Sequence, residues 1–229
     1  MKNVFKWVGI ILLLIKGLSI SYGQVEAPFI SLKEGEVFDV LLITQKPDSK
    51  EEFQAYVREV IPVGREMTYK PLPGFSVVSS TQGNVHPNYL VLAKWDNLDL
   101  RNKFLLDIEG KIPDFHDRRR AIWSYFATRY YEIEEETSFS IDKSKYHVAT
   151  ALWTEEEEII LAWEKRMLRF GGKELISLRG GYSPFGYLYD PTIFVISVWD
   201  NEAAYEAFKK ESTQFVQDSF KHINEFILR

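Results

Sequence analysis

The sequence predicts an α+β fold in which one unit of strands and helices occurs twice. A phrase repeats almost intact: PNYLVLAKWDN at 87–97 returns as PTIFVISVWDN at 191–201, and Phe104 and Phe208 follow at the same offset of 104. The segments around each copy follow the order strand, helix, strand, strand, helix. With 45% hydrophobic and 15% aromatic residues, the 229-residue chain can bury one large core or two small ones.

The first unit begins with the segment VFDVLLITQ at 37–45, whose length and content are typical of a strand. Ser49 and Glu52 predict a capping box before an amphipathic helix, whose apolar residues recur at i, i+3, i+4, i+7 and i+8. Pro62 and Gly64 disturb the last turn of this helix. The further elements are a strand at 75–80 between turns at 73–74 and 83–84, a strand at 89–95, a helix beginning at Asn97, and a closing strand at Ala127–Phe139.

The second unit repeats this order. A strand is predicted at 146–153, and Thr154 caps a helix that ends at Gly171-Gly172. Lys173–Arg179 is the next strand, a long loop follows from Gly180, and the last two elements are a strand at 193–199 and a helix beginning near 202. The polar stretch Ser140–Lys145 between the units is interpreted as a linker.

Strand–helix–strand–strand–helix is the order of a ferredoxin-like unit, here in tandem. Because such a sheet carries its helices on one face, its other face must also be covered. We therefore expect the two antiparallel sheets to pack face to face and enclose a cleft. The predicted division is a signal peptide at 1–23, a first repeat at 24–140 and a second repeat at 141–229.

In this order and in its two WDN phrases the chain resembles the dimeric α/β-barrel superfamily, in a fused two-repeat form, over roughly residues 37–226. The resemblance implies two sheets packed as one barrel within the chain. Relatives include cofactor-free monooxygenases, haem-binding enzymes such as chlorite dismutases and aldoxime dehydratases, lactone isomerases and sugar mutarotases. The exported two-repeat form is also similar to a flavobacterial dehydratase that acts on uronic-acid-ended oligosaccharides from ulvan.

The first 23 residues are typical of a secretory signal, with Lys2 and Lys6 before the apolar run Val8–Ile15 and cleavage before Gln24. Removing three lysines and no acid changes the net charge from −5 to −8, which argues against a nucleic-acid partner. The predicted location is periplasmic or secreted, without membrane insertion after cleavage. An uncleaved N-terminal anchor is the alternative. The chain has no cysteine, so disulfides play no part.

Strand alternation gives the first candidate site residues. One face of the first strand of each unit is apolar and is expected to meet the helices. The other face carries Asp39 and Gln45 in the first unit and His147 and Trp153 in the second, so this mixed face is assigned to the cleft. The alternative is that Asp39 and His147 lie at strand ends and contact water.

The segment DFHDRRRAIWSYF at 114–126 gives the second group. On a helix, His116, Arg119 or Arg120, and Trp123 share one face and would suit a carboxylated ligand, since arginine pairs with a carboxylate through two donors. The alternative is a solvated basic turn with Trp123 in the core.

The loop RGGYSPFGYLYD at 179–190 gives the third group, with Arg179 and a series of aromatic residues that can stack on sugar rings. The alternative is that these rings pack over the end of the barrel. Tyr130 and Tyr131 alternate on the closing strand, so one of them should point inward. The aromatic residues of the loop are Tyr182, Phe185, Tyr187 and Tyr189.

The predicted function is an exported dehydratase, a carbon–oxygen lyase that removes water from the non-reducing-end uronic acid of a small acidic oligosaccharide and leaves a 4,5-unsaturated residue. The types of residue present suit this chemistry, whereas the substrate is implied by the resemblance alone. A cation must neutralise the carboxylate, a base must take the α-proton, and an acid must protonate the leaving hydroxyl. The candidates are Arg119, Arg120 or Arg179 for the cation, His147 or His116 for the base, and Tyr131 or the other histidine for the acid, with Trp153 and Tyr187 against the sugar.

Two other functions stay open. One is a cofactor-free or haem-dependent oxidoreductase, in which His147 or His222 would be the haem ligand. The other is a non-catalytic protein that binds a glycan or another ligand. No cofactor and no metal site are expected, because the four histidines are scattered without metal-binding spacing. A homodimer is a candidate assembly.

Overall fold

The structure is a computed structural model that describes residues 27–184 and 189–229, and it has the predicted α+β class. The helices are α1 (Lys50–Glu66), α2 (Leu98–Lys111), α3 (Phe115–Ile122), α4 (Glu157–Arg169) and α5 (Glu202–Ser219). The strands are β1 (Phe29–Leu32), β2 (Val37–Gln45), β3 (Lys70–Gln82), β4 (Tyr89–Trp95), β5 (Trp123–Glu132), β6 (Thr137–Ser140), β7 (Tyr146–Trp153), β8 (Lys173–Arg179), β9 (Ile193–Trp199) and β10 (His222–Leu228).

The strand order confirms the tandem ferredoxin-like repeats. One half of the large sheet has the order β5-β2-β4-β3 and the other half has the order β10-β7-β9-β8. When the four strands of each repeat are numbered along the chain, both halves have the same order across the sheet, 4-1-3-2. All pairs within the halves are antiparallel.

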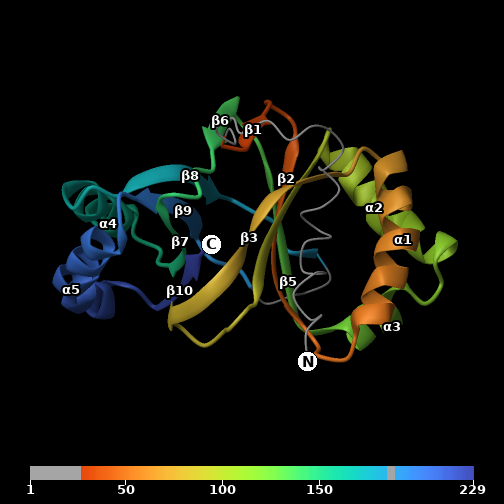
Figure 1. Ribbon diagram of the computed structural model, residues 1–229. Coiled ribbons are helices and arrows are strands. Elements are labelled where there is room, and N and C mark those ends of the chain that lie inside the picture. The colour runs from red at the N-terminus through yellow and green to blue at the C-terminus, as the bar shows by residue number, and fades with distance from the viewer. Residues whose placement is uncertain (1–26, 185–188) are drawn as a thin grey trace, which may run out of the picture.

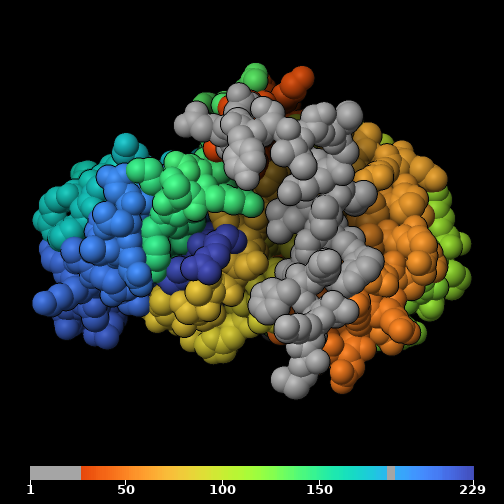
Figure 2. All heavy atoms as spheres, viewed as in Figure 1, coloured from red at the N-terminus to blue at the C-terminus, as the bar shows by residue number. Residues whose placement is uncertain are grey.

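The two halves are joined along both edges into a barrel. On one edge β3 pairs with β10, and Figure 2 shows the end of β10 beside β3 on the surface. On the other edge the backbone of Tyr130 in β5 exchanges two hydrogen bonds, of 2.9 and 2.7 Å, with Tyr182 after β8. Figure 1 shows the sheets facing each other, with α1, α2 and α3 outside one sheet and α4 and α5 outside the other.

The interior of the barrel is an apolar core to which both sheets contribute, including Phe38, Leu92, Ala149 and Phe194. One end of the barrel is filled by the two-stranded β1–β6 ribbon, which Figure 1 shows beside that end. Four side chains from or beside this ribbon belong to the same core: Ile30, Leu32, Phe139 and Ile141. A functional site in the barrel therefore has to lie toward the other end.

The repeated WDN phrase has the same structural role in both halves. Trp95 packs on Phe104 with ring centroids 5.1 Å apart, and Trp199 packs on Phe208 at 5.0 Å. The final asparagine is the N-cap of the following helix in each repeat. Asn97 Oδ1 accepts from Leu100 N at 2.9 Å, and Asn201 Oδ1 accepts from Ala204 N at 3.0 Å. The two tryptophans thus occupy equivalent surroundings, as a duplicated unit requires.

The strand registers correct one assignment. Val37 lies opposite Trp95 and Tyr146 lies opposite Trp199, so Phe38 is the equivalent of His147, and Asp39 is the equivalent of Val148. The prediction that Asp39 faces the cleft is wrong, because the residue equivalent to the inward-facing His147 is Phe38, and a shift of one residue places a side chain on the opposite face. Asp39 lies under the helices, where it accepts from Trp95 Nε1 at 2.9 Å and Arg101 Nε at 3.0 Å.

Several predicted boundaries also change. The closing strand at Ala127–Phe139 is two strands, β5 and β6, and β3 is longer than the predicted strand at 75–80. Helix α1 continues through Pro62 to Glu66. Ser49 caps it without a side-chain cap bond, because its hydroxyl donates to the carbonyls of Lys46 and Ile122. Glu156, not Thr154, is the N-cap residue of α4.

The predicted signal peptide lies outside the described residues, and the limits of the two repeats at 140 and 141 stay predictions. Within residues 27–184 and 189–229, no helix is both long enough and apolar enough to cross a bilayer.

Replacing either capping asparagine with alanine removes the acceptor for a backbone N–H at the start of α2 or α5. We expect Asn97→Ala and Asn201→Ala each to lower the free energy of unfolding by about 1 kcal/mol in urea denaturation. Asn97→Asp and Asn201→Asp keep an acceptor and should lose much less. A loss at only one of the two positions would contradict the equivalence of the caps.

Arg101 and Asp39 form a buried ion pair, with side chains 5% and 4% exposed. We expect Arg101→Met to lower the free energy of unfolding by about 3–5 kcal/mol, because it leaves a buried carboxylate without its cation. Lys103→Met on the same helix removes an exposed pair with Asp107 and should cost less than about 1 kcal/mol. Equal losses in the two variants would show that the buried pair does not hold α2 on β2.

Candidate functional site

Polar and aromatic side chains extend through the barrel interior from Tyr131, which lies opposite Phe38, to Trp153 and His222 at the end away from β1 and β6. They come from β5, β7, β10 and the segment that precedes β9, and each strand contributes its inward-facing alternate residues. We call this group the mouth cluster. Its residues are Tyr125, Arg129, Tyr131, Trp153, Tyr189, His222 and Asn224.

The cluster has an outer and an inner layer. Tyr125, Trp153, Tyr189 and His222 are half-buried, so solvent reaches the outer layer. Arg129, Tyr131 and Asn224 are buried behind them, with 6%, 3% and 1% of their surfaces exposed.

Trp153 connects the outer layer. Its ring meets Tyr189 edge-on, with centroids 5.4 Å apart and an angle of 88°, and it lies 4.7 Å from the His222 ring. These three side chains come from β7, β10 and the segment before β9. Trp153 therefore fixes the spacing of the donors on either side of it.

Arg129 is the buried cation of the cluster. Its guanidinium forms an ion pair with Asp190, contacts the Tyr189 carbonyl at 3.4 Å, and lies 5.7 Å from the centre of the Tyr131 ring. Its Nε is buried and has no hydrogen-bond partner among residues 27–184 and 189–229. A side chain at Gly181 would put its Cβ 2.5 Å from this Nε and against the Tyr131 ring, so glycine leaves the space that Arg129 occupies.

The hydrogen bonds of Asn224 determine how His222 can act. Asn84 N donates to Asn224 Oδ1 at 3.1 Å, so the amide nitrogen of Asn224 faces His222 Nε2, also at 3.1 Å. His222 Nε2 is then the acceptor, which leaves Nδ1 as the ring nitrogen that carries a hydrogen. Gly83 makes this contact possible: its φ is +94°, and a Cβ there would collide with the Asn224 side chain. His222 therefore presents an N–H donor rather than a base.

The three tyrosines of the cluster are neutral donors as well. Burial raises the pKa of Tyr125 to about 12 and raises the pKa of Tyr131 and Tyr189 well above the usual value for a phenol. The Tyr189 hydroxyl is buried and faces the Asn224 side chain. The cluster as a whole offers a guanidinium, an imidazole N–H and phenol O–H groups, which suits a ligand oxygen that carries negative charge.

The structure brings some of the predicted site residues into this cluster. Trp153 and Tyr131 lie in it, and Tyr131 is the member of the pair 130–131 that points inward. His147 also points into the barrel, but it lies at the opposite end of β7 from Trp153 and is 2% exposed. Its ring packs against Phe75 at 5.4 Å, and burial lowers its pKa.

The other predicted site residues do not come together, because α3 and α4 lie outside the barrel. His116 contacts Glu109 at 2.7 Å, and Arg119 packs 3.7 Å from the centre of the Phe126 ring on the helix side of β5. Arg120 is exposed and pairs with Asp117, and Arg179 pairs with Glu157 and Glu164 of α4. Trp123 begins β5 and packs against Tyr56. Tyr187 and Phe185 lie outside the described residues.

Arg129 and Asn224 were missed by sequence reasoning, and His222 was named only as a haem ligand. A signal for Arg129 was available. It is the one charged residue in the run ATRYY, two positions before Tyr131 and thus on the same face of the strand. A charge inside an apolar strand is rare without a partner or a function.

Neither of the two predicted haem ligands, His147 and His222, suits a haem. His147 Nε2 has no partner within the described residues, but it lies in the packed core beside Phe75, where a haem could not approach it. His222 Nε2 is held by Asn224. Among the described residues, no group of three or more His, Asp or Glu side chains is placed to hold a metal ion.

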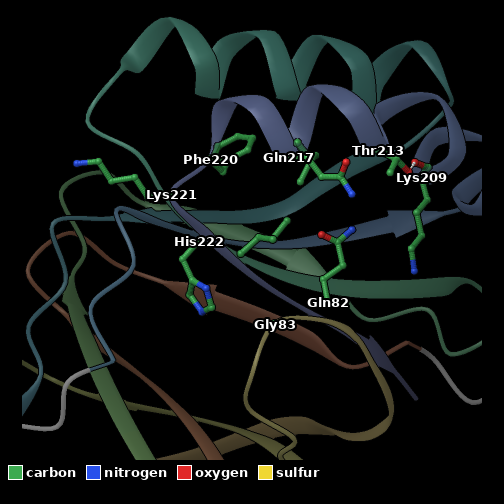
Figure 3. A pocket seen from close by; sticks show the side chains of 10 residues that line it. Gln82, Gly83, Lys209, Thr213, Gln217, Phe220, Lys221 and His222 are labelled. Atoms are coloured by element: carbon green, nitrogen blue, oxygen red, sulfur yellow. Dashed lines mark hydrogen bonds between the residues drawn. The ribbon is translucent and has the colours of Figure 1, made fainter.

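Two surface hollows lie outside the barrel, at the junctions of the two repeats. One, of about 500 Å³, is lined by residues of α5, the start of β10 and the end of β3. The other, of about 650 Å³, is lined by α2, β5 and the segment after β8, which are the corresponding elements of the other repeat. Figure 3 shows that His222 points away from Thr213 and Gln217 of α5, toward the other face of the sheet. His222 also lines the first hollow, while its ring belongs to the mouth cluster.

Comparisons with known proteins identify the fold. No family model matches the chain, and no curated protein matches its sequence. A solved structure of an anthrone oxidase-like protein is 17% identical, with a TM-score of 0.52 over 88% of this chain and 94% of the other. A mutant chlorite dismutase from Candidatus Nitrospira defluvii is 8% identical, with a TM-score of 0.50 over 86% of this chain and 93% of the other.

At this level of identity the likeness concerns the fold alone, and it agrees with the predicted α+β fold of two antiparallel sheets packed as a barrel. Membership of the dimeric α/β-barrel superfamily stays a prediction. The comparisons give no support for a dehydratase that acts on ulvan oligosaccharides. The exported location and the homodimer stay predictions.

His147 should make stability depend on pH. Burial lowers its pKa in the folded state, so the unfolded chain binds a proton that the folded chain excludes. We expect the free energy of unfolding to fall as the pH drops below about 6.5, by up to about 1.4 kcal/mol per pH unit from this group. Urea denaturation between pH 7.5 and 5 should show a shallower decline in His147→Leu. The exposed His86 provides the control, and His86→Leu should keep the wild-type slope; equal slopes in both variants would contradict the assignment.

Proposed function

We propose that the chain is an oxidoreductase that binds a hydroxylated aromatic or enolisable ligand in the mouth cluster as its anion and supports the reaction of that anion with dioxygen. The observation that carries this proposal is Arg129, a buried guanidinium whose Nε has no partner in the described residues and which lies beside the Tyr131 ring and the Tyr189 carbonyl. A buried cation of this kind favours the ionised form of a phenol or an enol.

The residues of the cluster supply three effects. Arg129 neutralises the ligand oxygen, and His222 Nδ1–H is a second donor that the Asn224 contact keeps in place. Trp153 and Tyr189 supply aromatic surface for the ligand rings. The half-buried outer layer lets the released proton leave to water, so the proposal needs no dedicated base.

One structural neighbour, an anthrone oxidase-like protein, suggests a concrete reaction to test. In that reaction a methylene flanked by aromatic rings becomes a carbonyl: the C–H₂ group and one O₂ give C=O and one H₂O. Deprotonation gives an electron-rich enolate, which is the species that can pass an electron to dioxygen. Stabilising that anion is the step that Arg129 would promote.

A second candidate is the dehydration of a uronic acid. Arg129 already holds a carboxylate, that of Asp190, and a guanidinium on a uronate carboxylate would make the α-proton more acidic. The two histidines predicted as the base, His116 and His147, lie outside the cluster. The cluster therefore offers no base for this reaction, and the dehydration ranks second.

Arg129→Met tests the role of the guanidinium in oxygen consumption. We expect wild-type protein to consume oxygen with anthrone-type or hydroquinone-type substrates, and Arg129→Met to lose about 10²–10³-fold in kcat/KM, as expected when a charged donor to a developing anion is removed. An oxygen electrode and product mass give the measurement. Arg129→Lys keeps the charge and should retain part of the activity.

Arg166→Met is the matched control, since Arg166 lies over the Phe215 ring on the outside of the second repeat. It should keep wild-type activity. A second arm incubates wild-type protein with saturated uronic-acid oligosaccharides and follows the absorbance of the unsaturated product. Product in that arm without oxygen uptake in the first would favour the dehydratase and overturn the oxidoreductase. Ligand binding without turnover in either arm would indicate a binding protein.

A further inference from the structure

The ion pair between Arg129 and Asp190 is strongly asymmetric. The arginine side chain is 7% exposed, whereas the aspartate side chain is 74% exposed. The cation belongs to β5 and is fixed by the barrel, and the acid lies on the segment that precedes β9. An exposed carboxylate thus covers a buried guanidinium from the solvent side.

The asymmetry makes the aspartate replaceable. Water solvates an exposed carboxylate well, so releasing Asp190 costs little. Leaving Arg129 without an anion costs much more, because its charge is buried. The exchange of Asp190 for another carboxylate keeps Arg129 paired throughout.

The guanidinium also has donor capacity to spare. The Asp190 carboxylate and the Tyr189 carbonyl both use Nη1, and Nε has no partner among the described residues. Arginine pairs best with a carboxylate through two parallel N–H donors. The carboxylate of a ligand can accept from Nε and a terminal nitrogen at once. Asp190 does not use Nε, so this two-donor geometry is available to the ligand.

The surroundings of the guanidinium select the rest of the ligand. The Tyr131 ring lies beside the guanidinium, and Tyr189, whose carbonyl contacts it, packs on Trp153 and lies near Tyr125. These side chains offer flat apolar surface, which favours a planar ring over a flexible or strongly solvated chain.

We propose that Asp190 occupies the subsite of a ligand carboxylate, and that the ligand of the mouth cluster is an aromatic carboxylate that displaces Asp190 from Arg129. This inference rests on the site of the proposed function and adds the ligand class and a residue that sets specificity. Asp190 competes with the ligand, so it lowers the affinity for every carboxylate and excludes weak ones. Neutral aromatic compounds with no ionisable oxygen have no means of displacing it.

Asp190→Asn gives the direct test, with benzoate as the anionic probe and benzamide as its neutral isostere. Isothermal titration calorimetry under nitrogen measures binding without turnover. We expect Asp190→Asn to bind benzoate at least about tenfold more tightly than wild-type protein, with benzamide binding unchanged. Arg129→Met should not bind benzoate. Circular dichroism checks that each variant is folded.

Asp200→Asn is the matched control, because Asp200 is an exposed aspartate that pairs with Lys145 at 2.8 Å on the outside of the protein. It should bind benzoate as wild-type protein does. Equal benzoate affinities in Asp190→Asn and wild-type protein overturn the inference, and so does a failure of Asp190→Asn to bind benzoate at all. If benzoate binds with the expected competition but no substrate consumes oxygen, the proposed function fails and the carboxylate subsite stands.

Discussion

Backbone pairing along two edges is the constraint on which this structure depends. Each four-stranded sheet has helices on one face only, so its other face has to be buried against something. The β3–β10 pair and the two hydrogen bonds between Tyr130 and Tyr182 join the sheets edge to edge, which turns two bare faces into one interior. Joining them also removes the free strand edges that would otherwise invite aggregation. The apolar core, the plugged end and the mouth cluster all follow from that closure.

The candidate site arises where the two repeats differ. The registers make Tyr125 equivalent to His222, Ala127 to Asn224, and Arg129 to Phe226. A symmetric barrel would place equal residues at both members of each pair. Here one repeat supplies the guanidinium and the other supplies the imidazole and the amide, so the cluster needs both halves. Duplication within one chain permits this difference, whereas two identical subunits would have to share every residue.

The layer between sheet and helices shows the same divergence. In the first repeat Trp95 Nε1 and Arg101 share the carboxylate of Asp39. In the second repeat Trp199 Nε1 donates to Ser197 Oγ at 3.1 Å, and Tyr205 donates to the buried Glu225 instead. Thr81 of the first repeat also donates to Glu225, at 2.7 Å, so this carboxyl helps to join the repeats beside the β3–β10 edge. Burial raises its pKa.

The sequence by itself determined the duplicated strand and helix order, because periodicity and turn residues are local properties that survive without knowledge of the fold. It also predicted a helix beginning at Asn97, the inward direction of one of Tyr130 and Tyr131, and the inward direction of Trp153. It could not place Asp39, because a slip of one residue in a strand moves a side chain to the opposite face, and the apolar pattern of VFDVLLITQ tolerates either register. Only the tertiary structure decided which charged residues meet. Arg119, Arg120 and Arg179 are close to aromatic residues in the sequence, but helix and strand direction carry them outside, whereas barrel closure brings Arg129, Tyr189 and Asp190 together from separate repeats.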